Sequence, residues 1–515
     1  MIKEIELVLL PEHSNDETFI RDSACKLVNI SPERVKNVQI IKRSIDARSR
    51  KVVFRIRLNV FIDEVFEPEI IADSYQNVSD KKPVLIIGAG PAGLFAALRC
   101  IEIGLKPIII ERGKDVKQRR RDLALINKEG IIDPDSNYCF GEGGAGTYSD
   151  GKLYTRSNKR GDIHYVLKTF VSHGATTDIL IDARPHIGTN KLPNIIVSMR
   201  DRILNDGGEI HLDCRVTDLI ISGNTLKGVL VGDKKFEAGS VILATGHSAR
   251  DIYYLLEKHN ILIEAKPFAL GVRIEHPQEI IDQAQYHCSD RDPYLPSSYY
   301  SLVEQVDNRG VFSFCMCPGG IIAPCSTDQN EIVVNGWSPS KRNNPFANSG
   351  TVVQINMEDV PGSIEDPFKM LKFQAEIEKL AFNAGGGQLV APAQRMVDFV
   401  NNRVSTDLPI NSYIPGTRSA DMASVLPEFI YKRLQKALPV FGKKMNGYYT
   451  NEAILVGVES RTSSPLRIPR DKETLQHPQL LGLFPCGEGA GYAGGIVSAA
   501  IDGMNCADAA FKKLN

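Results

Sequence analysis

The chain has 515 residues, a formal net charge of −1 and 24% charged residues. This length predicts roughly two to four domains, and the balanced charge argues against bulk binding of nucleic acid. No apolar run reaches the ~18 residues of a membrane-spanning helix. The N-terminus lacks a signal-peptide core, and the ten cysteines show no CxxC or zinc-type Cys/His spacing. We therefore expect a reducing, cytoplasmic compartment, no membrane association and no metal.

Residues 1–66 are predicted to form a small βαββ module. Strand-like segments at 2–10, 38–45 and 52–62 accompany a helical segment at 15–27, and apolar residues alternate from Phe54 to Ile62. The opposite strand face is basic: Lys42, Arg43, Arg48, Arg55 and Arg57. This face either binds a polyanion or is a solvated surface that docks onto the main domain.

Residues 67–82 are polar and aperiodic, which predicts a linker before a second domain. That domain opens with PVLIIGAGPAG at 83–93, where an apolar strand runs into Gly88, Gly90 and Gly93 and a helix follows. A second apolar strand ends at Glu111, about 20 residues further on. Gly88 permits the tight turn, Gly90 lets a pyrophosphate approach, and Gly93 lets helix and strand pack closely. The segment is therefore predicted to bind an ADP moiety.

The start of this helix, with Pro91 and Ala92, offers free N–H groups and a positive dipole end to phosphates. Further along, residues 209–246 form short strands with glycine or asparagine turns, and the last strand ends in Thr245-Gly246. Residues 266–455 are less regular, with short strands at 310–315 and 331–335 and helices at 366–382 and 427–438. The chain closes with a strand at 481–485, a glycine-rich turn and a helix that begins near Gly495.

Six different motifs stand out along the chain: FGEGGAGTYSDGKL at 140–153, GHSARD at 246–251, KPFALGVRIEHP at 266–277, FCMCPGG at 314–320, GVESRTSSPLRIPRD at 457–471 and CGEGAGYAGGIVSAA at 486–500. With the βαβ unit they resemble the FAD-binding fold of glutathione-reductase-like flavoproteins. More narrowly, the whole chain resembles the uncharacterised FAD-dependent dehydrogenase family. The resemblance implies an α/β protein with a Rossmann-like FAD-binding domain at 83–265 and 456–515, an inserted α+β substrate domain at 266–455, and the N-terminal module.

The resemblance implies FAD as the cofactor and indicates where it binds. Glu111 accepts hydrogen bonds from the adenosine ribose, and Arg112 neutralises the pyrophosphate or covers the adenine. Arg119 either contacts the flavin or lies on an exposed helix face. Val216 pairs with the adenine edge, and Thr245 and Gly246 lie on the ADP side.

Further residues are implied at the flavin itself. The glycine-rich segment 141–152 lies along the isoalloxazine, with these predicted contacts: Gly143, Gly144, Ala145, Thr147, Ser149, Asp150 and Lys152. Lys152 either places a positive charge by the ring, pairs with Asp150, or lies at the surface. Glu488, after Gly487, takes the place of the aspartate that bonds the ribityl chain in related flavoproteins. The helix starting at Gly495, Ile496 and Val497 points its N-terminus at N1 and O2.

The catalytic residues are not identified by the sequence, and the candidates are Lys152, Arg273, Cys315, Cys317 and Arg461. Cys315 and Cys317 alternate on a strand and so share a face; with Cys325 they form a thiol cluster that is either a redox or substrate site or part of the packing.

Two arginines suit an anionic substrate. Arg273 and Arg461 either bind a carboxylate or form buried pairs with Glu275 or Glu459. His247 is either a hydrogen-bonded helix cap or a base.

The leading hypothesis is an FAD-dependent oxidoreductase that acts on an unidentified small molecule. The chain lacks a second GxGxxG unit and the CxxxxC pair of NAD(P)H-dependent disulfide reductases, so chemistry of that kind is not expected. The flavin is reduced either by transiently bound NAD(P)H or by the organic substrate. The alternatives are a flavoprotein that binds RNA through its N-terminal module, and a non-catalytic flavin-bound scaffold.

Overall fold

The computed structural model describes residues 1–66, 74–155 and 161–515. Part of the expected linker, 67–73, lies outside the described residues. The remainder, 74–82, runs along the main body, where Val78 is fully buried and its N–H donates to the carbonyl of Asp206 at 2.8 Å. No helix within these described ranges is long and apolar enough to span a bilayer.

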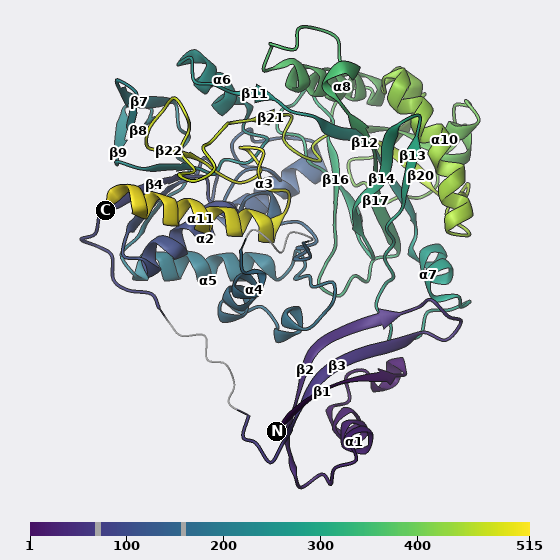
Figure 1. Cartoon of the computed structure of the whole chain (residues 1–515). Coiled ribbons are helices and arrows are strands. Elements are labelled where there is room, and N and C mark those ends of the chain that lie inside the picture. Colours follow the sequence, from purple (N-terminus) through teal and green to yellow (C-terminus); the bar gives the residue numbers. More distant parts are fainter. Residues whose placement is uncertain (67–73, 156–160) are drawn as a thin grey trace.

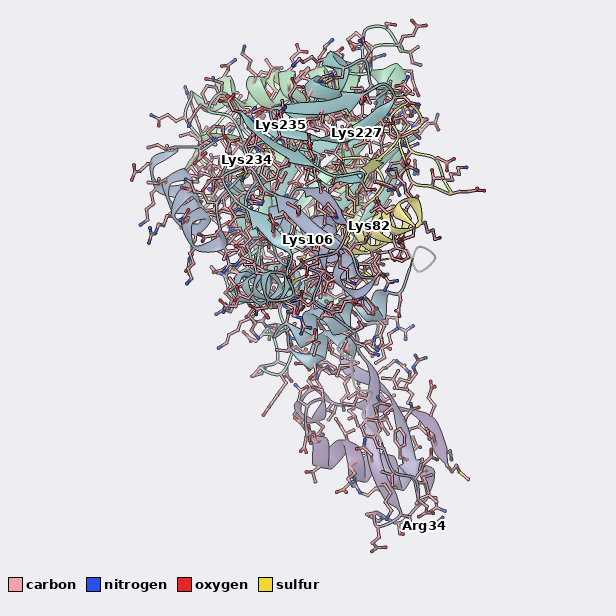
Figure 2. All side chains as sticks on the ribbon, turned by 90° about the vertical axis from the view of Figure 1, so that its left-hand side faces the viewer. Arg34, Lys82, Lys106, Lys227, Lys234 and Lys235 are labelled. Carbon is pink, nitrogen blue, oxygen red and sulfur yellow. The ribbon has the colours of Figure 1, made fainter. Side chains whose placement is uncertain are left out.

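The first 62 residues form a three-stranded antiparallel sheet with one helix, as the βαββ pattern predicts. The elements are β1 (Ile2–Leu9), α1 (Glu17–Val28), β2 (Val35–Asp46) and β3 (Val53–Ile62), with strand order β1-β3-β2. Ile56, Leu58 and Val60 of β3 are fully buried. Figure 1 shows this module beside α7 (Gln278–Tyr286), and Figure 2 shows it extending from the rest of the chain with Arg34 at its far end.

The arginines of the basic face of this module are paired with carboxylates. Arg43 forms ion pairs with Asp182 at 2.8 Å and with Asp178 at 2.9 Å, both on the main body. Arg48 and Arg55 both contact Asp46 within the module, at 2.6 and 2.7 Å. Arg43 therefore docks the module onto the main body, which is one of the two roles expected of this face.

A five-stranded parallel sheet forms the centre of the main body, in the order β22-β10-β4-β5-β6. Its strands are β4 (Pro83–Ile87), β5 (Lys106–Ile110), β6 (Glu209–His211), β10 (Val241–Leu243) and β22 (Leu483–Pro485). One face packs on α2 (Pro91–Glu102), α4 (Ile163–Ser172), α5 (Leu192–Asn205) and α11 (Ile496–Leu514). The other face packs on α6 (Arg250–Lys258) and an antiparallel sheet of β7 (Asp218–Ser222), β8 (Thr225–Val231) and β9 (Lys234–Glu237). The fold is thus of the α/β type, with a parallel sheet covered on both faces, and α3 (Val116–Glu129) follows β5.

A second, seven-stranded sheet lies beside it (Figure 1), in the order β13-β14-β17-β12-β20-β18-β19. Its strands are β12 (Phe268–Pro277), β13 (Val303–Val306), β14 (Arg309–Cys317), β17 (Phe346–Ile355), β18 (Ala391–Arg395), β19 (Thr417–Ser419) and β20 (Ile454–Glu459). Two short pairs accompany it: β11 (Glu264–Ala265) with β21 (Leu466–Arg467), and β15 (Ile321–Pro324) with β16 (Val334–Trp337). The helices of this region are α7, α8 (Lys369–Gly385), α9 (Met396–Val400) and α10 (Glu428–Lys444).

The sequence analysis expected only short strands in residues 266–455 and missed the extent of this second sheet. Its two ten-residue strands, β12 and β17, are buried along almost their whole length, so they lack the polar–apolar alternation that reveals a half-buried strand. The expected boundary between residues 455 and 456 is also wrong, because it falls inside β20. Glu459 in that strand still pairs with Gly271 of β12, so the sheet continues to the end of β20.

Candidate functional site

A pocket of about 410 Å³ lies between the carboxyl edge of the parallel sheet and the seven-stranded sheet. This volume falls within the roughly 300–1,000 Å³ of small-molecule sites. In open parallel sheets ligands bind at this carboxyl edge, because the loops after the strands meet there.

Glycine backbone forms the wall of the pocket at the end of β4. Gly88 has φ +105°, and a Cβ there would lie 2.5 Å from the carbonyl oxygen of Ala244. A Cβ on Gly93 would lie 1.9 Å from the carbonyl oxygen of Gly88, so α2 packs on β4 only because this residue is glycine. A Cβ on Gly144 would meet Gly90 Cα at 2.9 Å, so the two predicted glycine segments touch.

Glu111, at the end of β5, ties these turns together. Its Oε2 accepts from the Ala89 N–H at 2.8 Å, and its Oε1 accepts from the N–H groups of Gly113 and Gly141, both at 2.9 Å. The residue is 5% exposed and lines the pocket. A carboxylate has about four lone-pair sites, so Glu111 keeps one for a ligand hydroxyl while it organises the backbone.

Two helices begin at the pocket. Gly90 is the N-cap of α2 and Gly495 the N-cap of α11, and neither residue provides a side-chain cap. The helices pack closely, since a Cβ on Gly503 of α11 would lie 2.0 Å from the Ala92 carbonyl oxygen. Their free N–H groups therefore face one pocket, which suits a ligand with separated negative groups.

Most of the predicted cofactor residues line this pocket: Gly88, Gly90, Pro91, Ala92, Glu111, Arg112, Gly144, Ala145, Ser149, Asp150, Lys152, Val216, Thr245, Gly246, Gly487, Glu488, Gly495 and Ile496. The predicted residues outside the lining are Gly93, Arg119, Gly143, Thr147 and Val497. Thr147 supports the turn from behind, because its hydroxyl donates to the Glu142 carbonyl at 3.1 Å.

Both roles expected of Arg119, a flavin contact and a position on an exposed helix face, are wrong. Its side chain is fully buried, so it is not on an exposed face, and it lies behind the pocket wall. Its guanidinium donates to the carbonyls of Asn137, Tyr138 and Glu142 at 2.8 to 2.9 Å. Arg119 therefore holds the loop that leads into the glycine-rich segment.

Arg112 and His247 contribute to the lining in ways that the sequence left open. Arg112 pairs with Asp135 at 2.6 Å and Asp251 at 2.9 Å, and lies 4.1 Å over the ring of Phe140.

His247 is not a helix cap, because α6 begins at Arg250 with Ala249 as its N-cap. Its buried Nδ1 has no hydrogen-bond partner, and burial lowers its pKa to about 3. A neutral imidazole nitrogen is thus unsatisfied at the pocket.

Lys152 and the two cysteines meet at the far end of the pocket. Lys152 Nζ lies 3.6 Å from Cys315 Sγ, 3.5 Å from Cys317 Sγ and 3.7 Å from Asp150. Both sulfurs thus lie on the Lys152 side of β14, although the strand bulges between Phe314 and Cys317. Cys315 lines the pocket, whereas Cys317 is fully buried. All ten cysteines are free thiols.

Arg273 is not positioned to bind a substrate. It is fully buried outside the pocket lining and pairs with Glu459 at 2.9 Å. It also donates to Asn348 at 2.8 Å and to the Cys315 carbonyl at 2.7 Å. The structure therefore has the buried pair, with Glu459 rather than Glu275 as the partner.

Arg461 reaches the pocket but is also paired. It contacts Glu331 at 2.5 Å and Glu378 at 3.1 Å, and Glu378 further binds Arg250 at 2.7 Å. The positive charges of Arg250 and Arg461 lower the pKa of Glu378 to about 2, although its burial opposes this. Two carboxylates therefore balance these two arginines.

The turn at Gly487 depends on residues that the sequence analysis missed. Asp502 on α11 accepts from the Gly487 N–H at 2.7 Å and pairs with Arg470 at 2.6 Å. Cys486 and Cys506 lie beside Asp502, a grouping that resembles metal ligands. Because Arg470 already occupies the carboxylate and also donates to the Cys506 sulfur at 3.6 Å, the group is an ion-paired support for the turn. No local pattern signals it, since Arg470 is 32 positions from Asp502.

These features fit FAD in the pocket. The glycine turns admit a pyrophosphate, Glu111 keeps an acceptor site, two helix N-termini face the cavity, and His247 has an unsatisfied nitrogen. Comparison with known proteins agrees: residues 83–119 match an FAD binding domain, and residues 267–462 match the C-terminal domain-like family of FAD-dependent proteins. Residues 1–61 match a domain of unknown function.

A protein of Clostridium beijerinckii, described as uncharacterized, is 38% identical over 523 residues, covering 97% of each chain. The chain therefore belongs to a family of uncharacterised FAD-dependent proteins.

Solved structures with weak similarity include an oxidase and a reductase-like protein. Glycine oxidase from Bacillus cereus aligns at 13% identity and a TM-score of 0.30, over 84% of this chain and 96% of that one. A geranylgeranyl bacteriochlorophyll reductase-like protein from Thermoplasma acidophilum aligns at 13% identity and a TM-score of 0.35, over 84% and 79%. These similarities are too low to support a function.

Proposed function

We propose that the protein is an FAD-dependent oxidoreductase that moves a hydride or electrons between FAD and a small-molecule substrate. In this proposal the FAD-binding domain is of the glutathione-reductase type, and the seven-stranded sheet is an inserted substrate domain. The observation that carries the proposal is the continuity of the pocket, which joins the glycine turns at β4 to a chamber with Lys152 and Cys315.

Bound there, FAD supplies two-electron chemistry. The start of α2, with Gly88 and Gly90, would hold the pyrophosphate, and Glu111 the ribose. Val216 would face the adenine, and Glu488 the ribityl chain. The start of α11 and the Lys152 ammonium would stabilise negative charge on the reduced ring.

Burial raises the pKa of Glu488 to about 7, against the opposing effect of Lys266. Such a carboxyl is partly protonated at neutral pH and can donate or accept a hydrogen bond. The electron donor in this proposal is either NAD(P)H or the organic substrate.

The test is the absorption spectrum of the purified full-length protein, with the released cofactor identified by mass. Flavin bands with released FAD support the cofactor, and anaerobic bleaching by NADH or NADPH supports a nicotinamide donor. Bound FAD that does not bleach favours the organic substrate as donor. Protein that contains no flavin and binds none when FAD is added contradicts the proposal.

A further inference from the structure

The strongest unexplained feature is the thiol pair at the far end of the pocket. Cys315 has φ +48°, a left-handed conformation that residues with a Cβ rarely adopt. It sits on the β14 bulge, where the register against β17 shifts. Bulges and strained residues of this kind often aim a side chain at a functional site. Here the bulge exposes Cys315 in the pocket and leaves Cys317 buried behind it.

Two cations surround the sulfurs. Lys152 Nζ lies within 3.6 Å of both, and Arg273 Nη2 is 3.5 Å from Cys317 Sγ. The nearby carboxylates already form ion pairs: Asp150 pairs with Arg342 at 2.6 Å, and Glu459 pairs with Arg273 at 2.9 Å. A positive environment of this kind favours the thiolate, which is the reactive form of cysteine.

The pKa values of the two thiols are shifted in opposite directions. A hydrogen bond from Cys317, aided by the charges of Lys152 and Arg273, lowers the pKa of Cys315 well below its ordinary value of 9.0 although burial opposes it. The same hydrogen bond, with burial, raises the pKa of Cys317. Cys325 lines the same pocket, yet burial raises its pKa. The charge of Asp150 opposes the lowering of the Cys315 pKa, and the charge of Cys315 in turn raises the pKa of Glu488. The pair thus combines an exposed thiolate with a protonated thiol behind it.

We propose that Cys315 and Cys317 form a dithiol that reduces a small-molecule disulfide entering the pocket. The Cys315 thiolate attacks one sulfur of the substrate, whose S–S bond breaks and releases a thiolate. The Cys317 sulfur then attacks Cys315 and displaces the second substrate thiol, which takes the Cys317 proton. The substrate gains two electrons, and the pair becomes a Cys315–Cys317 disulfide.

This inference rests on the proposed function only for the reduced flavin that returns the pair to the dithiol. The two thiols lie on β14 of the seven-stranded sheet, on the substrate side of the pocket. The CxxxxC pair of the disulfide reductases lies instead beside the first helix of the FAD-binding domain, which is α2 in this chain.

The experiment treats the full chain, with its thiols reduced and its FAD oxidised, anaerobically and freed of reductant, with one equivalent of 2,2′-dithiodipyridine. We expect two thiopyridones per protein and a Cys315–Cys317 disulfide by peptide mass mapping. Cys317→Ser should release one thiopyridone and keep the adduct on Cys315. Cys288→Ser, which removes a half-buried thiol outside the pocket lining, should behave as the wild type.

Lys152 provides the second arm of the test. Lys152→Met should slow the first release at neutral pH by about tenfold or more, because each unit of pKa changes the thiolate fraction tenfold. Lys152→Arg keeps the charge and should retain most of the rate. Reaction first at other cysteines, a stable adduct on wild-type Cys315, or equal rates for all Lys152 variants would overturn the inference. The flavin spectrum of the same samples separates that failure from loss of the proposed function.

Discussion

The two ends of the pocket are built in different ways. The nucleotide end is made of glycine backbone at the tips of neighbouring parallel strands, where Gly88 and Gly93 leave no room for a Cβ. The far end is made of charged side chains from separate antiparallel strands, such as Arg273 on β12 and Glu459 on β20. The first end is thus sensitive to added atoms, and the second to lost partners.

The largest expected effect comes from adding atoms at the nucleotide end. Gly88→Val should destabilise the protein by about 5 kcal/mol and abolish FAD binding, because φ +105° strains any side chain and the Cβ would meet the Ala244 carbonyl at 2.5 Å. Soluble yield, urea unfolding and flavin content measure this. Gly310→Ala is the matched control, since its nearest new neighbour would be 3.7 Å away. Wild-type stability of the valine variant would contradict the steric account.

Removing one partner at the far end should have a somewhat smaller effect. Arg273→Met should lower the free energy of unfolding by about 4 kcal/mol, because it leaves Glu459 buried without its counter-charge. Urea unfolding of the single and double variants measures the coupling. Arg273→Met with Glu459→Gln should cost clearly less than the sum of the two single changes. Additive effects within about 0.5 kcal/mol would show that the pair is not coupled.

The pH dependence of stability offers a finer test of the seven-stranded sheet. Burial raises the pKa of Glu275 on β12 from its ordinary 4.5 to about 7, although Ser412 hydrogen-bonds to it. Between these values the folded state holds a proton that the unfolded state has released. This contribution is therefore complete below about pH 4.5 and lost as pH rises to about 7, by about 3 kcal/mol.

Glu275→Gln should remove this contribution. Denaturant unfolding of wild type and variant at pH 5 and pH 8 measures it, as the stability of the wild type relative to the variant should decrease with rising pH. A constant difference across that range would mean that Glu275 does not hold the extra proton.

The sequence by itself determined the nucleotide end of the pocket. The strand, glycine turn, helix and terminal Glu111 lie within about 30 residues, so their spacing alone places them at one edge of a parallel sheet. The same holds for the start of α11 at Gly495, where a short strand and a glycine turn precede the helix. Local backbone requirements leave a clear signature, because few residues besides glycine satisfy them.

Only the tertiary structure decided the far end. Arg273 had two candidate partners, and strand pairing selected Glu459, 186 positions away. The alternation of Cys315 and Cys317 predicted a shared face, but only the fold, with a bulge where β14 pairs with β17, decided that Cys315 lines the pocket while Cys317 is buried. Arg119 lies on a helix of consecutive arginines, and the carbonyls of residues 137–142 decided that it is the buried one. Buried charges are stabilised by whatever partner the fold brings within about 3 Å, and sequence spacing does not encode that neighbour.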